Sequence, residues 1–389
     1  DMTDNFPFIA LLDGGISEAS LSTRRIRFDR NELAGSFGDI GTDLPLIIGI
    51  VLATGMDSAS VFVVFGALQI LTGLVYGLPM PMQPLKAMAV LIITQKLSGD
   101  IVYAAGLAIG ATMLLLTLSG LLEKLARWIP ECVVRGIQFG LGLSLASLAL
   151  KSYVPAMGLP GYAMAAAGLI VMVSLWGNRR FPPGLLLIGI GVLYAVVSGL
   201  HLLAIAEGLS VRLPQLHQPN LADLWTGFLL LALPQLPLSI SNSVIATEKT
   251  VRDLFPERAV SIRKIGITYS VANLTAPFLG GIPVCHGCGG LAGHYAFGAR
   301  TGGSVIIYGS FYVVLGLFFS GVLQEILKVF PQPILGVVLL FEALTLLALL
   351  RDQARNARST MIALLVGVVA LSLPQGYLLG LVIGTVVFY

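Results

Sequence analysis

The stretch best suited to chemistry is GIPVCHGCGG, residues 281–290, where Cys285 and Cys288 stand at CxxC spacing on either side of His286. Two thiols with an imidazole between them suggest a zinc site or a redox site. Such a site needs further ligands, yet the sequence has no second cysteine pair and places His294 two turns further on. We therefore expect no bound metal and no cofactor. The two cysteines then serve as small polarizable residues that line a pocket.

The glycines and the proline of the same stretch favour the binding of an anion by bare backbone. If a helix begins just after Cys285, the amides of residues 287–290 are first-turn donors without partners inside the helix. The helix dipole adds partial positive charge at that end. Gly289 and Gly290 have no side chain to hinder a ligand. Proteins bind oxyanions at helix N-termini in this way.

Three other apolar stretches contain polar residues beside prolines: FGDIGTDLPL (37–46), LPMPMQPLKAM (78–88) and LPQLPLSISNS (233–243). In the second of them, Gln83 and Lys86 follow Pro81, and we expect them to face the anion from the opposite side. Lys86 could supply a full positive charge, or could instead pair with Asp39 or Asp43. Charged residues inside a membrane are costly and are functional candidates by default.

Three of these groups are candidates for coupling transport to protons. Asp39 and Asp43 are four residues apart and share one helical face, and His286 can change charge near neutral pH. Each also has a structural interpretation. The aspartates could cap their segment and brace Lys86 or Arg300, and the histidine could be a buried, hydrogen-bonded residue. For Glu342, in another apolar segment, we favour the structural interpretation, as a partner for a helix end.

The elements that must position these residues are membrane helices. The chain has 389 residues, of which 56% are hydrophobic and 11% are charged, whereas soluble domains contain about 25% charged residues. We therefore expect an integral protein of the bacterial inner membrane that contacts the lipid bilayer. The net charge of +3 is small and the basic residues are scattered, which excludes nucleic acid as a partner.

Apolar segments separated by polar or Pro/Gly breaks predict an all-α fold with about fourteen transmembrane segments. Their centres lie near residues 45, 68, 88, 111, 140, 168, 192, 234, 267, 291, 311, 340, 364 and 381. With a cytoplasmic N-terminus, this topology places eighteen Lys and Arg residues inside, four outside, and Lys86 within the membrane. Such a bias agrees with the positive-inside rule.

The four unusual stretches fall in segments one, three, eight and ten, so they correspond in pairs when the segments are numbered by sevens. Seven segments per half make the second half an inverted copy of the first, and interrupted segments in such a repeat mark a midplane substrate site. We therefore expect a cytoplasmic N-terminal segment (1–30), a first repeat (31–205) and a second, inverted repeat (206–389). Segments three and ten are expected to be half-helices.

The stretch GGIPVCHGCGGLAGHYAFGARTG (280–302) resembles the segment-ten signature of the sulfate permease (SulP) superfamily. FGDIGTDLPL and PMPMQPLKAMAV resemble the other characteristic blocks of its MOT-type molybdate transporter branch. The resemblance implies a core domain and a gate domain, with the substrate between half-helices three and ten and an elevator-like movement of the core. Carried over by motif position, the substrate-binding candidates are Thr42, Gln83, Lys86, Gln235, Ser239, Cys288, Gly289 and Gly290.

The resemblance implies a secondary active transporter, not an enzyme, that imports molybdate with protons as the candidate coupling ion. Many SulP proteins carry a C-terminal STAS domain; this chain ends at Tyr389, so we expect that domain to be lacking. Where SulP transporters commonly have an arginine in segment ten, this chain has Gly290. A homodimer is suggested by analogy alone.

Two alternatives stay open. A sulfate or tungstate carrier would have the same fold, whereas a nucleobase carrier needs acidic residues where this chain has Ser239 and Gly289. A membrane thiol or metal enzyme using the CHGC motif is the alternative from a different class of protein.

Overall fold

The computed structural model describes residues 26–175, 183–198 and 210–389. Several predictions concern residues outside these ranges: most of the N-terminal segment, with Arg24 and Arg25, the basic pair Arg179 and Arg180, and the boundary between the two halves at residue 205.

Helices make up most of the described chain. The first half contains α2 (Arg30–Ser36), α3 (Ile40–Thr54), α4 (Ser58–Tyr76), α5 (Lys86–Gln95), α6 (Gly99–Leu118), α7 (Leu121–Trp128), α8 (Glu131–Leu148), α9 (Gly158–Ser174) and α10 (Pro183–Ser198). The second half contains α12 (Leu224–Gly227), α13 (Leu233–Leu238), α14 (Thr247–Leu254), α15 (Ile262–Thr275), α16 (Cys288–Ala296), α17 (Gly303–Val329), α18 (Gln332–Ala348), α19 (Ala357–Ser372) and α20 (Gly376–Phe388). The chain also contains two short strands, β1 (Gln83–Pro84) in the first half and β2 (Val284–Cys285) in the second.

The expected all-helical membrane architecture is confirmed, although the number of spans stays a prediction. Six helical runs of the described chain are long and apolar enough to cross a membrane, or seven if the bent pair α2 and α3 forms one span. Four shorter apolar helices accompany them: α5, α10, α19 and α20. Every predicted segment centre lies in a helix or helical run. The short α5 and α16 agree with interrupted segments three and ten.

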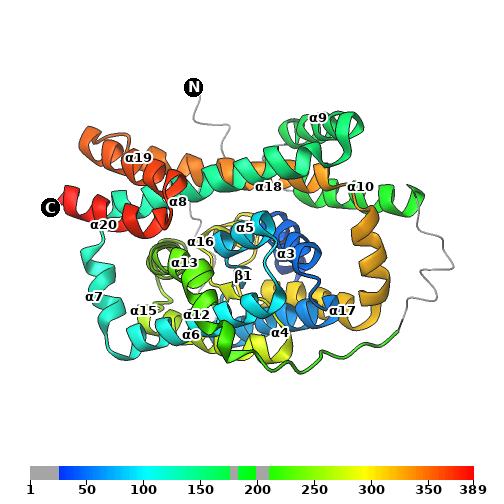
Figure 1. Cartoon of the computed structure of the whole chain (residues 1–389), viewed down its shortest axis with the longest axis horizontal. Helices are drawn as coiled ribbons and strands as arrows, with labels where there is room; N and C mark the ends of the chain where they lie inside the picture. Colours follow the sequence, from blue (N-terminus) through cyan, green and yellow to red (C-terminus); the bar gives the residue numbers. More distant parts are fainter. Residues whose placement is uncertain (1–25, 176–182, 199–209) are drawn as a thin grey trace.

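The helices form two groups (Figure 1). One group, here called the inner bundle, contains α3, α4, α5, α6, α12, α13, α15, α16 and α17. The other, here called the outer layer, contains α8, α9, α10, α18, α19 and α20 and runs along one side of the inner bundle. The helix α7 leads from α6 in the inner bundle to α8 in the outer layer. The strand β1 lies near the middle of the inner bundle.

The half-helices α5 and α16 are built in the same way. In each, an extended segment precedes the helix, and these two segments pair as antiparallel strands, with Gln83 opposite Cys285 and Pro84 opposite Val284. Proline explains why the chain is not helical at this point: it has no N–H to donate and disfavours helical backbone in the residue before it. Pro81 and Pro283 stand in equivalent places, each five residues before its half-helix begins.

Each extended segment is also held by a carboxamide from the preceding long helix. Gln69 donates from Nε2 to the Met82 carbonyl (2.6 Å) and accepts from the Met82 amide at Oε1 (3.0 Å). Asn273 does the same for Val284, at 2.7 Å and 3.0 Å. Irregular backbone inside a membrane protein must have its hydrogen bonds satisfied by the protein. These two side chains satisfy them for Met82 and Val284.

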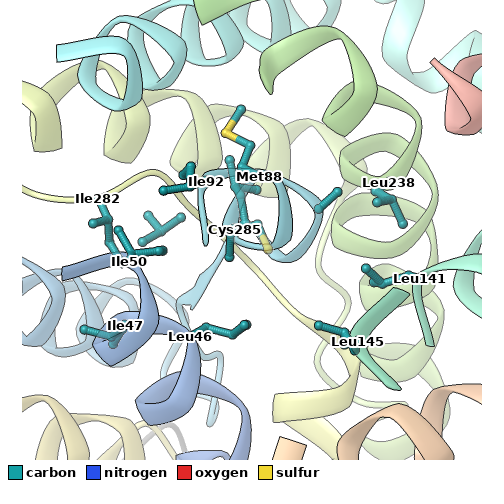
Figure 2. Packing of buried hydrophobic residues seen from close by; sticks show 14 of the residues in the cluster. Leu46, Ile47, Ile50, Met88, Ile92, Leu141, Leu145, Leu238, Ile282 and Cys285 are labelled. Carbon is teal, nitrogen blue, oxygen red and sulfur yellow. The ribbon is translucent and has the colours of Figure 1, made fainter. Parts of the chain in front are cut away.

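The seam between the two groups is apolar. Leu141 and Leu145 on α8 belong to one buried cluster with Leu46 on α3 and Met88 on α5 (Figure 2). All four side chains are at most 1% exposed. Such a seam has no directional bonds of its own, so the polar contacts that cross it stand out.

Candidate functional site

The N-terminal ends of α5 and α16 lie together at the strand pair. The helix α5 begins at Lys86 and α16 begins at Cys288, each three residues after a residue of the paired register, Gln83 or Cys285. The second helix therefore starts slightly later than the predicted position just after Cys285. Its first turn contains Gly289 and Gly290, as predicted. Helix N-termini expose unpaired N–H groups and carry partial positive charge.

Asp39 and Gln83 form the most tightly bonded pair of predicted site residues. The Gln83 Nε2 lies 2.7 Å from each carboxylate oxygen of Asp39. Both residues are buried, and Gln83 Oε1 has no hydrogen-bond partner. A Cβ added at Gly290 would overlap the Asp39 carboxylate. The glycine is therefore required here by the close approach of an aspartate, and not only by the approach of a ligand.

Lys86 forms an ion pair with Glu342, not with Asp39 or Asp43. Its Nζ lies 2.8 Å from Glu342 Oε1, across the seam from α5 to α18. Asp39 is already bonded to Gln83. Asp43 accepts a hydrogen bond from the Tyr308 hydroxyl at 3.1 Å. Glu342, for which we favoured a role at a helix end, is therefore a member of the site.

Gln235 and Ser239 also reach the end of α5. Gln235 Oε1 accepts from the amides of Ala87 (3.0 Å) and Met88 (3.2 Å), which are first-turn donors of α5. Its Nε2 donates to Ser239 Oγ at 3.4 Å, and Ser239 lies 2.7 Å from the Tyr269 hydroxyl. A carboxamide oxygen therefore occupies two first-turn amides of α5. Of the two half-helices, α16 has the less obstructed first turn.

Cys288 contacts residues that the sequence did not single out. Its Sγ donates to Asn242 Oδ1 at 3.2 Å, and Gln138 Nε2 donates to the same oxygen at 2.7 Å. Gln138 is fully buried on α8, so this contact also crosses the seam. A buried glutamine in an otherwise apolar segment is a signal that the sequence offered. Asn242 lies within the stretch LPQLPLSISNS (233–243) of the sequence analysis.

His286 does not join this group. Its Nδ1 lies 3.2 Å from the Pro81 carbonyl, which can only accept, and its Nε2 lies 2.7 Å from Thr268 Oγ1. Both nitrogens are therefore engaged, which favours the structural interpretation of this residue. Cys285 and Cys288 are free thiols, and the described chain contains no group of three His, Cys, Asp or Glu residues able to hold a metal.

We expected Asp39 or Asp43 to brace Arg300, whereas the contacts described here come from Tyr295 and Glu32. The Arg300 guanidinium lies over the Tyr295 ring, with Cζ 3.6 Å from the ring centroid. The nearby backbone is capped by Glu32, which accepts from the amides of Arg300, Thr301 and Ser304. Asp43 lies one turn beyond Asp39, with Oδ1 buried and without a hydrogen-bond partner. Thr42 is buried between these aspartates.

The site thus offers one lysine, the first turn of α16 and several neutral polar side chains to a small anion. It also contains three carboxylates close to the lysine, from Asp39, Asp43 and Glu342. Chemically, the lysine and the open first turn of α16 can pair with a small anion, and the carboxylates can pair with the lysine in its place.

The sequence matches the family model described as "Molybdate transporter of MFS superfamily" over residues 31–145 and 227–346. It is 32% identical to molybdate transporter 1 of Arabidopsis thaliana over 369 residues, covering 83% of this chain and 80% of that protein. It is 34% identical to molybdate transporter 2 of the same plant over 394 residues, covering 88% and 84%.

Solved structures are similar in fold. The overall structure of SLC26A9 matches with a TM-score of 0.67 at 13% identity, covering 92% of this chain and 65% of that one. The transmembrane domain of the cyanobacterial bicarbonate transporter BicA matches with a TM-score of 0.64 at 14% identity, covering 93% and 98%. The helices are thus arranged as in SLC26A9 and BicA, although the family description names the MFS superfamily.

Proposed function

This chain belongs to the molybdate transporter family, and from that premise we propose that it binds molybdate between the tips of α5 and α16 and carries it across the membrane. The relatives named above are transporters, and the fold is shared with membrane proteins named for anion transport. Molybdate is a compact dianion with four oxygens. Each oxygen can accept hydrogen bonds from amides, hydroxyls or an ammonium group.

The observation that carries the proposal is the pairing of β1 with β2, which brings Lys86 and Gly289 into one place. Lys86 supplies the full positive charge in the first turn of α5. Gly289 leaves the first turn of α16 open, since a Cβ there would have a single neighbour within 4 Å, Glu342 Oε1 at 3.7 Å. The other proposed ligands are Thr42, Gln83, Gln235, Ser239, Cys288 and Gly290.

We infer that transport is secondary active import by an elevator-like movement of the inner bundle against the outer layer. The apolar seam supports this mechanism, because side chains without directional bonds can slide past one another. The polar contacts that cross it would have to exchange, among them those from Lys86 to Glu342, from Gln138 to Asn242 and from the Tyr153 hydroxyl to the Pro45 carbonyl. A cytoplasmic N-terminus in a bacterial inner membrane belongs to the same proposal.

Asp39 and Asp43 are the proposed sites of proton coupling. Both are buried, and both lie at the start of α3 next to the substrate ligands. A dianion that enters beside ionised carboxylates is repelled at short range in a medium of low dielectric constant. Uptake of a proton by one of these carboxylates reduces that repulsion, which couples proton uptake to the entry of the dianion. His286, with both nitrogens engaged, is the weaker candidate.

The alternative substrates are sulfate and tungstate. Sulfate is a smaller tetrahedral dianion than molybdate. A site of amides and neutral donors distinguishes the two anions by how many of their oxygens have hydrogen-bond donors in reach. Calorimetric titration of the purified protein with molybdate, tungstate and sulfate tests the assignment. We expect molybdate to bind more tightly than sulfate. If molybdate neither binds nor accumulates in liposomes containing the protein, the proposed function is wrong.

A further inference from the structure

Glu342 lies where the substrate is expected. Its carboxylate oxygen Oε1 is 2.8 Å from Lys86 Nζ, at the first residue of α5. The same oxygen is 3.7 Å from the position that a Cβ would take at Gly289, in the first turn of α16. This single oxygen therefore contacts the tip of α5 and lies close to the open first turn of α16.

The chemistry of this carboxylate matches that of an oxyanion. An ionised carboxylate is a hydrogen-bond acceptor only, and a lysine ammonium beside it is a donor only. Within the described chain, Lys86 is the hydrogen-bond partner of Glu342, and Glu342 is that of Lys86. The Lys86 side chain is 4% exposed and the Glu342 side chain 19% exposed. The lysine is thus enclosed, whereas the glutamate is partly exposed.

Glu342 also belongs to a different part of the molecule from the groups it contacts. It lies midway along α18 in the outer layer, while Lys86 and Gly289 belong to the inner bundle (Figure 1). On the inner bundle, the nearby Asp39 already has Gln83 as its partner. The negative charge that Lys86 needs in the empty protein is therefore supplied from across the seam.

We propose that Glu342 is a tethered anion that occupies the substrate's place in the empty protein and is displaced when the substrate binds. This inference rests on the proposed function and deepens it. On binding, Lys86 exchanges the carboxylate for an oxygen of the dianion, and Glu342 turns towards water. The exchange breaks a charged contact between the outer layer and the inner bundle. Substrate binding therefore also frees the inner bundle to move against the outer layer.

Two effects of Glu342 oppose the substrate. The carboxylate competes for Lys86, and its charge repels the incoming dianion. When a fraction of the molecules has its site blocked, the apparent affinity falls in proportion to the fraction that remains open. If about one empty molecule in ten has an open site, removing the competitor tightens binding about tenfold.

The decisive variant is Glu342→Gln, which keeps the size of the side chain and removes its charge. We expect calorimetric titration of the purified full-length chain with sodium molybdate to give a dissociation constant about tenfold lower than that of the wild type. Glu342→Asp keeps the charge but shortens the reach to Lys86, so we expect an intermediate gain. The matched control is Glu131→Gln, which removes ion pairs with Lys249 and Arg135 on an exposed glutamate and should leave binding unchanged.

Unchanged or weaker binding by a folded Glu342→Gln variant would overturn the inference. If that variant does not fold, Glu342→Asp decides in the same way: tighter binding supports displacement, and unchanged or weaker binding excludes it. The proposed function fails separately. A wild-type protein that does not bind molybdate refutes the function, whereas binding by the wild type without a gain in the variants refutes only the role of Glu342.

Discussion

Gln69 and Asn273 hold equivalent positions: each forms paired hydrogen bonds with the backbone of the residue four places before a half-helix begins. The equivalence agrees with the predicted inverted repeat, in which segments two and nine correspond. It also explains why extended backbone is tolerated deep in an apolar protein. Each carboxamide satisfies the backbone N–H and C=O of Met82 or Val284, as a neighbouring strand would.

The first prediction concerns this role of Asn273. Asn273→Ala leaves both the N–H and the C=O of Val284 buried without partners, at a cost of about 1–3 kcal/mol each. Asn273→Asp keeps the acceptor but places a carboxyl oxygen against the Val284 carbonyl at a buried position, so it should be destabilising as well. Thermal melting of the purified variants measures both. Gln218→Ala, at an exposed position, is the control. Equal stability of all three variants would contradict the proposed role.

The second prediction concerns the charge of Lys86. Lys86→Gln removes the one ammonium in the first turn of α5 and leaves Glu342 without its partner. A hydrogen bond to a charged group contributes about 1.5–3 kcal/mol, so we expect molybdate binding to weaken roughly 10–100-fold. Uptake into liposomes should fall accordingly. Lys151→Gln, on an exposed lysine, should transport normally. Full uptake by Lys86→Gln would exclude this lysine as a ligand.

The third prediction separates two neighbouring glycines. A Cβ at Gly289 meets Glu342 Oε1 at an ordinary contact distance of 3.7 Å, whereas a Cβ at Gly290 overlaps the Asp39 carboxylate. Gly289→Ala should therefore keep the wild-type melting temperature and lose much of its transport. Gly290→Ala should lose stability as well. If the two variants cannot be distinguished by melting, the packing of Asp39 against α16 is not as described.

The fourth prediction tests proton coupling at Asp39. In Asp39→Asn, the new amide can donate to Gln83 Oε1, which has no partner in the wild type. We therefore expect a folded protein that binds molybdate but whose uptake no longer responds to an imposed pH gradient. The measurement is uptake into liposomes with an acidic or a neutral exterior. Wild-type uptake that ignores the gradient would remove proton coupling from the proposal altogether.

The fifth prediction tests the rival enzyme. The Cys288 thiol donates to Asn242, and a serine hydroxyl can make the same bond. The double variant Cys285→Ser, Cys288→Ser should therefore transport within about twofold of the wild type, since only neutral hydrogen bonds change. A metal or thiol enzyme would lose its function entirely. It would also contain zinc at one ion per chain, or a redox-active dithiol, in the purified wild-type protein.

The local features of the site could be predicted from the sequence, whereas its pairings could not. Pro84 and Pro283 mark where helices cannot continue, and the glycines after Cys285 mark an open helix start. These are short-range rules. The bond between Lys86 and Glu342 joins residues 256 positions apart, and a single sequence offers three carboxylates as possible partners. Proximity along the chain favoured Asp39 and Asp43. In the fold, Gln83 donates a hydrogen bond to Asp39 and Tyr308 donates one to Asp43.

The end of α5 shows the same limit. From the sequence we expect Lys86 to face the anion from this segment, and the structure places it at the first residue of α5. The sequence does not predict that Gln235, from another helix, already accepts from two first-turn amides of α5. The signal was present, because Gln235 is a polar residue between prolines in an apolar run. Its partner depends on packing between elements far apart in the chain.

The strand pair has a consequence for how the protein is made. The ribosome releases Gln83 and Pro84 long before Val284 and Cys285, their partners. Until translation reaches the second half, the first extended segment has no partner strand and α5 has no opposite tip. The proposed anion site therefore does not exist in the nascent first half of the chain. It forms late in synthesis, when α16 is inserted beside α5, which is made earlier.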